Sequence, residues 1–174
     1  MKKELLAWIR DIFIAFLIAF IILTLFKPII VQQHSMEPNF YSGDYIIAFK
    51  QAYRLSGEPQ RGDIIVFKSE LTDEKGRDKN LIKRIIAVGG ETVSIKDGYV
   101  YINGEKIDEP YLLEQGMSGD MEETTVPEGC LFCCGDNRDV SVDSRSDRVG
   151  FVSEDDIVGK VVLRLFPFNS IKTF

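Results

Sequence analysis

A serine, a histidine and a lysine are the first candidates for chemistry in this sequence. His34, the only histidine, directly precedes Ser35, a pair that suggests a serine hydrolase with a histidine base. Neighbouring residues of an extended chain point to opposite sides, so His34 is poorly placed to take the proton of the Ser35 hydroxyl. We therefore interpret His34 as a bystander, and the base must come from elsewhere in the chain.

Lys83 is the alternative base. A neutral lysine can activate a serine if burial lowers the lysine pKa toward the working pH. Lys83 lies in the run Leu81–Val88, which is apolar apart from Lys83 itself and Arg84. A buried strand here would take water away from the Lys83 amine and would turn Arg84 to the other side. Taken alone, an exposed lysine on an edge strand is the simpler interpretation.

The three cysteines form a C-x-x-C pattern that invites a metal or redox interpretation. In a strand, Cys130 and Cys133 face opposite sides, and Cys130 and Cys134 lie about 13 Å apart, too far for a disulfide. No second pair of cysteines or histidines completes a metal site. We predict buried, inert thiols, and we expect neither a metal nor a cofactor.

The N-terminal segment predicts a membrane anchor. Residues Leu5–Phe26 are almost wholly apolar, and a helix of this length crosses the roughly 30 Å bilayer core if Arg10 snorkels outward. A core helix would need a polar face, which residues 12–26 lack. A removable signal peptide would end in small residues, whereas Lys27-Pro28 and a β-branched run follow here.

The charges that flank the anchor predict its orientation. Lys2, Lys3 and Arg10 lie before or within the start of the apolar segment, and only Lys27 follows it closely. Positive charge favours the cytoplasmic side of a membrane, so we expect a cytoplasmic N-terminus and the bulk of the chain outside.

Short strands and turns are predicted beyond the anchor, once Pro28 has ended the helix. The expected strands are Ile29–Val31, Gly43–Phe49, Gly62–Phe67, Leu81–Val88, Val93–Ile95, Tyr99–Ile102, Cys130–Cys134 and Val158–Phe166. Asp97-Gly98 and Asn103-Gly104 predict the turns of a small antiparallel meander. The charged stretch Lys68–Asn80 predicts a solvated loop.

Residues 105–128 are strongly acidic. They contain eight acids and one base, a net charge of −7. We interpret them as a solvated flap inserted into the β domain, although an acidic loop with no role fits the sequence as well.

Composition excludes several classes of protein. The chain has 174 residues, enough for about one domain. Its 45% hydrophobic residues exclude intrinsic disorder. A net charge of −6 without a basic cluster predicts no nucleic-acid partner.

Four patterns, in this order, resemble the conserved boxes of type I signal peptidases. They are Ser35-Met36-Glu37-Pro38, Arg61–Phe67, Lys83-Arg84-Ile85 with Gly89-Gly90-Glu91, and the long Gly135–Arg145 box. The resemblance runs from the anchor to Phe151. It implies a membrane-anchored serine endopeptidase that uses a Ser/Lys dyad to remove signal peptides from exported preproteins.

The resemblance also implies roles for particular residues. Ser35 matches the family nucleophile and Lys83 its general base, and Ser141 falls where a serine orients that lysine. The Ser35 backbone N–H would be one oxyanion donor, and Gln33 stands where a small hydroxyl residue can supply the second. The remaining matches imply structural support of the site: an ion pair of Asp143 and Arg145, and the scaffold residues Asp136, Asn137 and Arg138.

These expectations define one architecture. We predict a mainly β protein, in which one transmembrane helix precedes an antiparallel catalytic domain with an inserted hairpin and flap. Residues 1–28 would form the cytoplasmic tip and anchor, residues 29–174 the extracytoplasmic peptidase domain, and residues 90–128 the insertion. The family fold implies that the substrate lies as an added strand beside the strands of the serine and the lysine. Exported preproteins and the lipid bilayer are the expected partners of a single-pass, monomeric membrane protein.

Two alternatives remain open from the sequence. A self-cleaving Ser/Lys repressor relative would need a DNA-binding domain where the anchor stands. A membrane-tethered β module without catalytic activity would bind partners at the cell surface.

Overall fold

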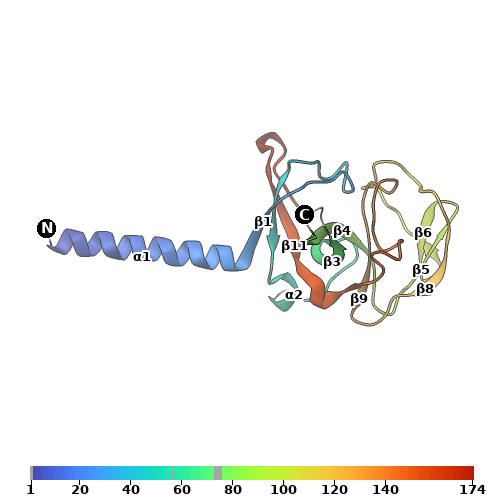
Figure 1. The fold of residues 1–174 in the computed structure, drawn as a ribbon, viewed down its shortest axis with the longest axis horizontal. Coiled ribbons are helices and arrows are strands. Elements are labelled where there is room, and N and C mark those ends of the chain that lie inside the picture. The colour runs from blue at the N-terminus through green and yellow to red at the C-terminus, as the bar shows by residue number, and fades with distance from the viewer. Residues whose placement is uncertain (1, 56, 73–75) are drawn as a thin grey trace.

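A computed structural model describes residues 2–55, 57–72 and 76–174. One long helix leads into a body built of two β-sheets (Figure 1). The helices are α1 (Lys2–Leu25), α2 (Ala52–Leu55) and the 3-10 helices η1 (Glu154–Asp156) and η2 (Phe168–Ser170). The strands are β1 (Phe26–Ile30), β2 (Tyr45–Phe49), β3 (Ile64–Thr72), β4 (Asp78–Val88), β5 (Thr92–Lys96), β6 (Tyr99–Ile102), β7 (Glu105–Lys106), β8 (Met121–Thr125), β9 (Cys130–Cys134), β10 (Val152–Ser153), β11 (Ile157–Phe166) and β12 (Lys172–Thr173).

All strand pairs are antiparallel. The larger sheet has the order β1-β2-β11-β3-β4-β9-β10, with β12 beside β11, and the smaller sheet has the order β7-β6-β5-β8. The smaller sheet lies at the end of the body farthest from α1 (Figure 1). The expected mainly β fold with one N-terminal helix and an inserted hairpin is therefore confirmed.

The helix α1 ends at Leu25, three residues before Pro28. The prediction that Pro28 terminates the helix placed the helix end too far along the chain. Pro28 lies inside the edge strand β1, where a missing N–H is tolerated. Within α1, Leu6–Leu25 has a mean hydropathy of 2.4 and is not buried against the body, so the helix is long and apolar enough to cross a membrane. Lys50 closes its C-terminal end, because its backbone N–H donates to the Leu25 carbonyl and its Nζ to the Leu23 carbonyl.

The prediction of a solvated loop over Lys68–Asn80 was wrong for residues 68–72 and 78–80, while residues 73–75 lie outside the described residues. Strand β3 continues to Thr72 and strand β4 begins at Asp78, with Lys68 opposite Asn80 and Thr72 opposite Asp78. Their side chains alternate between exposed and half-buried, so this end of the hairpin needs no apolar run. The backbone hydrogen bonds of the ladder hold these polar residues in strands despite their composition.

Strands β4 and β9 carry hydrophobic residues on both faces. Ile86 and Phe132 belong to a core cluster shared with the smaller sheet, whereas Ile85 and Leu131 belong to a cluster within the larger one. A register shift between Ile85 and Ala87 interrupts the ladder with β9. Coverage of both faces explains why these strands are continuous apolar runs rather than alternating ones.

The acidic segment 105–128 is only partly a flap. Its ends form β7 and β8, and β8 pairs with β5 in the smaller sheet. Between them, Glu109 is only 6% exposed and pairs with Arg138, which is buried as well. The segment is thereby attached to the Gly135–Arg145 box instead of moving over it as a solvated loop.

We predict that Glu109→Ala destabilises the protein. The substitution leaves the buried guanidinium of Arg138 without its carboxylate, a loss that typically costs about 3 kcal/mol of the free energy of unfolding. Urea unfolding of the full chain in detergent, followed by the circular dichroism of the sheets, measures this loss. Glu114→Ala, an exposed acid of the same segment, is the control and is expected to change the free energy of unfolding by less than about 0.5 kcal/mol. Equal effects of the two variants would contradict the anchoring role of Glu109.

Candidate active site

The structure brings Ser35 and Lys83 together. Lys83 Nζ and Ser35 Oγ lie 2.6 Å apart in a hydrogen bond, although the residues are 48 positions apart in the chain. Lys83 comes from the middle of β4, and Ser35 lies in the turn that follows β1. Ser35 is 8% exposed and Lys83 only 1% exposed. The two groups thus form a buried pair of hydroxyl and amine within the hydrogen-bond reach that a serine nucleophile and a lysine base require.

Burial lowers the pKa of Lys83 from its ordinary value near 10.5 to about 8. Loss of solvent is the largest cause, because an ammonium group loses more than a neutral amine when water is removed. The charge of Asp143 acts in the opposite direction, and the charge of Arg145 lowers the lysine pKa. About a tenth of Lys83 is therefore neutral at pH 7, far more than for a lysine in water.

Arg145 neutralises Asp143 beside the dyad. Arg145 Nε and Nη2 donate to the two carboxylate oxygens of Asp143, at 2.8 and 2.9 Å. Burial alone would raise the pKa of Asp143, but the hydrogen bonds and charge of Arg145 outweigh it, and that pKa is lowered. Pairing with Arg145 limits how strongly Asp143 can favour the ammonium form of Lys83.

Arg84, the neighbour of Lys83, lies on the other face of β4 and has its own partners. Its Nε and Nη2 donate to the two oxygens of Asp136, both at 2.8 Å, and its guanidinium lies 4.1 Å from the ring centroid of Tyr111. Asn39 Nδ2 donates to Asp136 Oδ2 and to the Tyr111 carbonyl, both at 2.8 Å. Through Asp136 and Asn39, the turn that carries Ser35 is tied to the strand that carries Lys83.

The Gly135–Arg145 box also holds the backbone of the nucleophile. The Asn137 N–H donates to the Ser35 carbonyl at 3.0 Å. At Gly135, an added Cβ would lie 2.4 Å from that carbonyl oxygen and 2.3 Å from Ser141 Oγ, so only glycine fits. Ser141 Oγ is buried beside the turn that carries Ser35. It forms no hydrogen bond to Lys83, but it interacts with Asp143 and helps to lower the pKa of that carboxyl.

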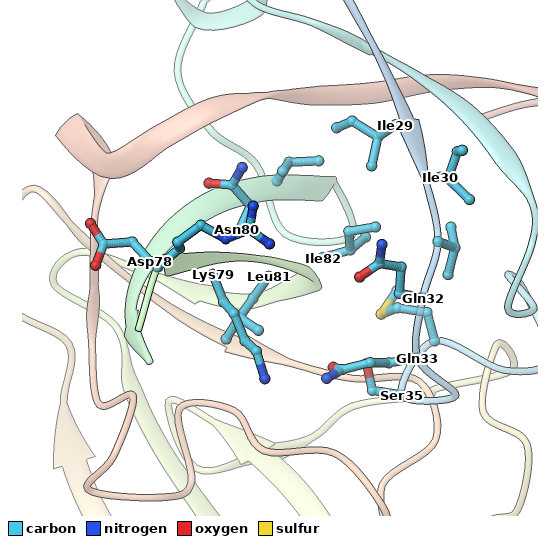
Figure 2. A pocket seen from close by; sticks show the side chains of 14 residues that line it. Ile29, Ile30, Gln32, Gln33, Ser35, Asp78, Lys79, Asn80, Leu81 and Ile82 are labelled. Atoms are coloured by element: carbon cyan, nitrogen blue, oxygen red, sulfur yellow. The ribbon is translucent and has the colours of Figure 1, made fainter. Parts of the chain in front are cut away.

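Two cavities meet at Ser35. The first has a volume of about 420 Å³ and lies between β1 and the start of β4; its apolar lining includes Ile29, Ile30, Val31, Met36, Leu81 and Ile82. The second, of about 340 Å³, extends from Ser35 toward Leu71, Val140, Val142 and Arg148. Gln33 lines both cavities, is exposed, and lies next to Ser35 (Figure 2).

The His34 side chain contacts Glu37 and not the Ser35–Lys83 pair. The side chain is 68% exposed, and its Nδ1 lies 2.7 Å from Glu37 Oε1. The structure gives it no hydrogen bond to Ser35 among the described residues, in agreement with the interpretation as a bystander.

Two of the three cysteines are buried in the core, whereas Cys130, which was also predicted to be buried, is only partly buried. Cys133 and Cys134 are buried in different hydrophobic clusters, and burial raises the pKa of both thiols. Thiols with raised pKa values carry little thiolate and are poor nucleophiles. In the described part of the chain, no group of three or more His, Cys, Asp or Glu residues could hold a metal ion.

Sequence reasoning missed Asn39, Tyr111 and Glu109 as supports of the site. Arg84 offered an indirect signal, because an arginine inside an apolar strand requires a buried carboxylate. Glu109 offered none, since seven other acids in the same segment look alike in sequence.

Comparison with known proteins gives concordant matches. The family model for signal peptidase, peptidase S26, matches residues 5–166. The chain is similar to signal peptidase I of Bacillus licheniformis, with 37% identity over 181 residues that cover 98% of this chain and 94% of the relative. It is also similar to signal peptidase IB of Staphylococcus aureus (strain Mu50), with 35% identity over 190 residues, 99% of this chain and 95% of the relative. A crystal structure of a signal peptidase I from Enterococcus faecalis V583 has 35% identity and a TM-score of 0.49, covering 59% of this chain and 96% of that one.

We predict that Lys83→Met stabilises the protein while abolishing activity. A folded-state pKa of about 8 against about 10.5 in the unfolded chain means that folding opposes protonation of Lys83. This cost is fully present below pH 8 and disappears as the pH rises through 10.5. Methionine, of similar volume, has no such cost, so the free energy of unfolding of the variant at pH 7 should exceed that of the wild type by about 3 kcal/mol.

Urea unfolding of the full chain in detergent at a series of pH values tests this prediction. The difference between Lys83→Met and the wild type should narrow between pH 8 and 10.5. Lys68→Met, at an exposed position of β3, is the matched control and should show no such gap. A Lys83→Met variant less stable than the wild type across this range would contradict a desolvated, destabilising lysine.

Proposed function

The chain belongs to the signal peptidase family, peptidase S26, and we propose that Ser35 and Lys83 carry out its reaction. It is a serine endopeptidase that cleaves signal peptides from exported preproteins. The observation that carries the residue assignment is the 2.6 Å contact of Ser35 Oγ with the amine of Lys83, both buried. A binding module without catalytic activity has no need of a desolvated lysine beside a serine.

In the first half of the reaction, Ser35 attacks the carbonyl carbon of the scissile peptide bond. Neutral Lys83 accepts the hydroxyl proton as the new Oγ–C bond forms and the carbonyl oxygen becomes an oxyanion. The ammonium group then gives this proton to the leaving amine as the C–N bond breaks. The mature protein departs with a new N-terminus, and the signal peptide stays bound to Ser35 as an ester.

In the second half, Lys83 is neutral again and accepts a proton from a water molecule that attacks the ester. The ester C–O bond breaks, the proton returns to Ser35 Oγ, and the signal peptide leaves with a new carboxylate. The backbone N–H of Ser35 has no hydrogen-bond acceptor in the described part of the chain, which suits a donor to the oxyanion. Gln33, next to Ser35, is the proposed side-chain donor (Figure 2).

Residues of the Gly135–Arg145 box support Ser35 and Lys83. In the proposal, Asp143 and Arg145 hold the charge balance around Lys83, and Asp136, Asn137 and Arg138 fix the backbone of the box through the bonds described above. Ser141 stands beside the nucleophile loop, where its hydroxyl can turn toward the lysine once a substrate is bound.

The open edge of β4 offers a place for the substrate. On one side β4 pairs with β3 over most of its length, but on the other side it pairs with β9 only from Arg84 to Val88. The backbone groups of residues 79–82 therefore face the first cavity, opposite β1. An extended peptide can pair with this edge as an added strand, and apolar side chains around the cavity would contact the small residues before the scissile bond.

The anchor places the reaction at a membrane. An N-terminal apolar helix together with the relatives supports membrane anchoring. We propose that the N-terminus is cytoplasmic and the β body extracytoplasmic, because Lys2, Lys3 and Arg10 outnumber Lys27 at the ends of the helix. One chain supplies both Ser35 and Lys83, so the site needs no second copy, and we propose a monomer in contact with lipid.

Removal of either dyad residue is predicted to remove activity to the same extent. Ser35→Ala, Lys83→Ala and the double variant should each lose at least about 10³-fold in kcat/KM, since a nucleophile without its base is nearly inert. Cleavage of an exported preprotein by the full chain in detergent measures this. Ser118→Ala and Lys68→Ala, both at exposed positions, are the matched controls. Additive losses in the double variant, or an equal loss in His34→Ala, would refute the Ser/Lys dyad.

The rate is predicted to rise with pH through the lowered pKa of Lys83. Below about pH 8 the ammonium form predominates and cannot accept the Ser35 proton, so kcat/KM should increase about tenfold per pH unit and level off above about 8. Lys83→Arg should stay inactive at every pH, because the guanidinium keeps its proton. A profile governed by a group near 10.5 would show that the working base is not desolvated.

A further inference from the structure

The second cavity begins at Ser35, and unlike the first it includes none of the residues of β1. The first cavity is lined by Ile29 and Ile30 of β1, which follow directly from α1, and its apolar walls come from this strand, Met36, Val66 and the pair Leu81 and Ile82. The signal peptide is the membrane-bound, apolar part of a preprotein, so the residues before the scissile bond belong on this side. The residues after the bond must then leave Ser35 on the other side, through the second cavity.

The charge of the second cavity is one-sided. Arg148 lines only the second cavity and Lys79 lines both, and no aspartate or glutamate is among the described residues that line the second one, whereas Asp78 lines the first. His34 also lines the second cavity, but His34 is already paired with Glu37. The chain as a whole has a net charge of −6, so a basic cavity runs against the overall balance.

Among the described residues, neither basic side chain has a carboxylate partner, whereas most other arginines of the β body, and Lys160, have one. Five other arginines of the body pair with an acid: Arg61, Arg84, Arg138, Arg145 and Arg164. Within the described residues, neither Lys79 nor Arg148 forms an ion pair. In Figure 2 the Lys79 side chain extends from β4 toward Gln33, while Asp78 points the other way.

We propose that the second cavity binds the first residues of the mature protein and that Lys79 and Arg148 select acidic side chains there. The inference rests on the proposed function, since it takes Ser35 as the point of cleavage. The ligand class is an acidic peptide segment directly after the scissile bond. Lys79 is half-buried on a strand and Arg148 is exposed on a loop, so they can meet side chains at successive positions of an extended substrate.

The test uses the full chain in detergent and three preproteins that are identical up to the scissile bond. Their next two residues are Glu-Glu, Ala-Ala or Lys-Lys. For the wild type we expect the order Glu-Glu, Ala-Ala, Lys-Lys in kcat/KM, with about tenfold between the extremes at low salt. The spread should shrink to about twofold in 1 M salt, because mobile ions screen exposed charges.

Charge reversal identifies the residues. In the Lys79→Glu/Arg148→Glu variant the order of the three substrates should reverse, and in Lys79→Gln/Arg148→Gln the spread should collapse. Lys96→Glu/Lys106→Glu makes the same change in net charge on the smaller sheet and should keep the wild-type order.

Three outcomes would overturn the inference. A wild type that cleaves all three substrates equally shows that the cavity does not select charge, while the peptidase function stands. An unchanged order in both cavity variants shows that Lys79 and Arg148 are not the selecting residues. If the wild type cleaves none of the substrates, this result contradicts the proposed function and therefore also the inference that rests on it.

Discussion

An amine buried without a carboxylate partner is the constraint on which the rest of this structure depends. Lys83 has to be desolvated to be a base, and desolvation is unfavourable for a group that is charged in the unfolded chain. The fold keeps Lys83 in the middle of a strand that is covered on both faces, and Arg145 takes up most of the charge of the nearby Asp143. Stability is exchanged here for reactivity, as in many active sites.

Two adjacent basic residues of β4 show two different ways in which the loss of water around a charged group can be compensated. Arg84 keeps its proton and is matched by a bidentate carboxylate and an aromatic face. Lys83 is matched by a hydroxyl and tends to lose its proton. The alternation of a strand sends the two side chains to opposite faces, so one residue organises the scaffold while its neighbour faces the nucleophile.

Much of the fold followed from local patterns, and the errors have physical causes. Asp97-Gly98 and Asn103-Gly104 predicted turns, and Asp97 and Asn103 do adopt positive φ angles of 51° and 52°. The extension of β3 and β4 into a charged stretch could not be predicted from composition, because the backbone hydrogen bonds between strands do not depend on the polarity of the side chains. Ser35 and Lys83 could be paired only through the resemblance, since their contact joins segments far apart in sequence. In sequence, Glu109 cannot be told from the other acids of its segment, and only its ion pair with Arg138 in the folded protein distinguishes it.

The turn that carries Ser35 is held by hydrogen bonds to residues far along the chain, and this affects when the enzyme becomes active during its synthesis. The Ser35 carbonyl accepts a hydrogen bond from the N–H of Asn137, and Arg84 donates to Asp136. The ribosome therefore has to add roughly a hundred residues after Ser35 before the site can form. During its own synthesis, the chain is therefore an inactive hydrolase whose apolar N-terminal helix has already been made. A nascent peptidase of this design cannot cleave any protein, itself included, before its Gly135–Arg145 box has been synthesised.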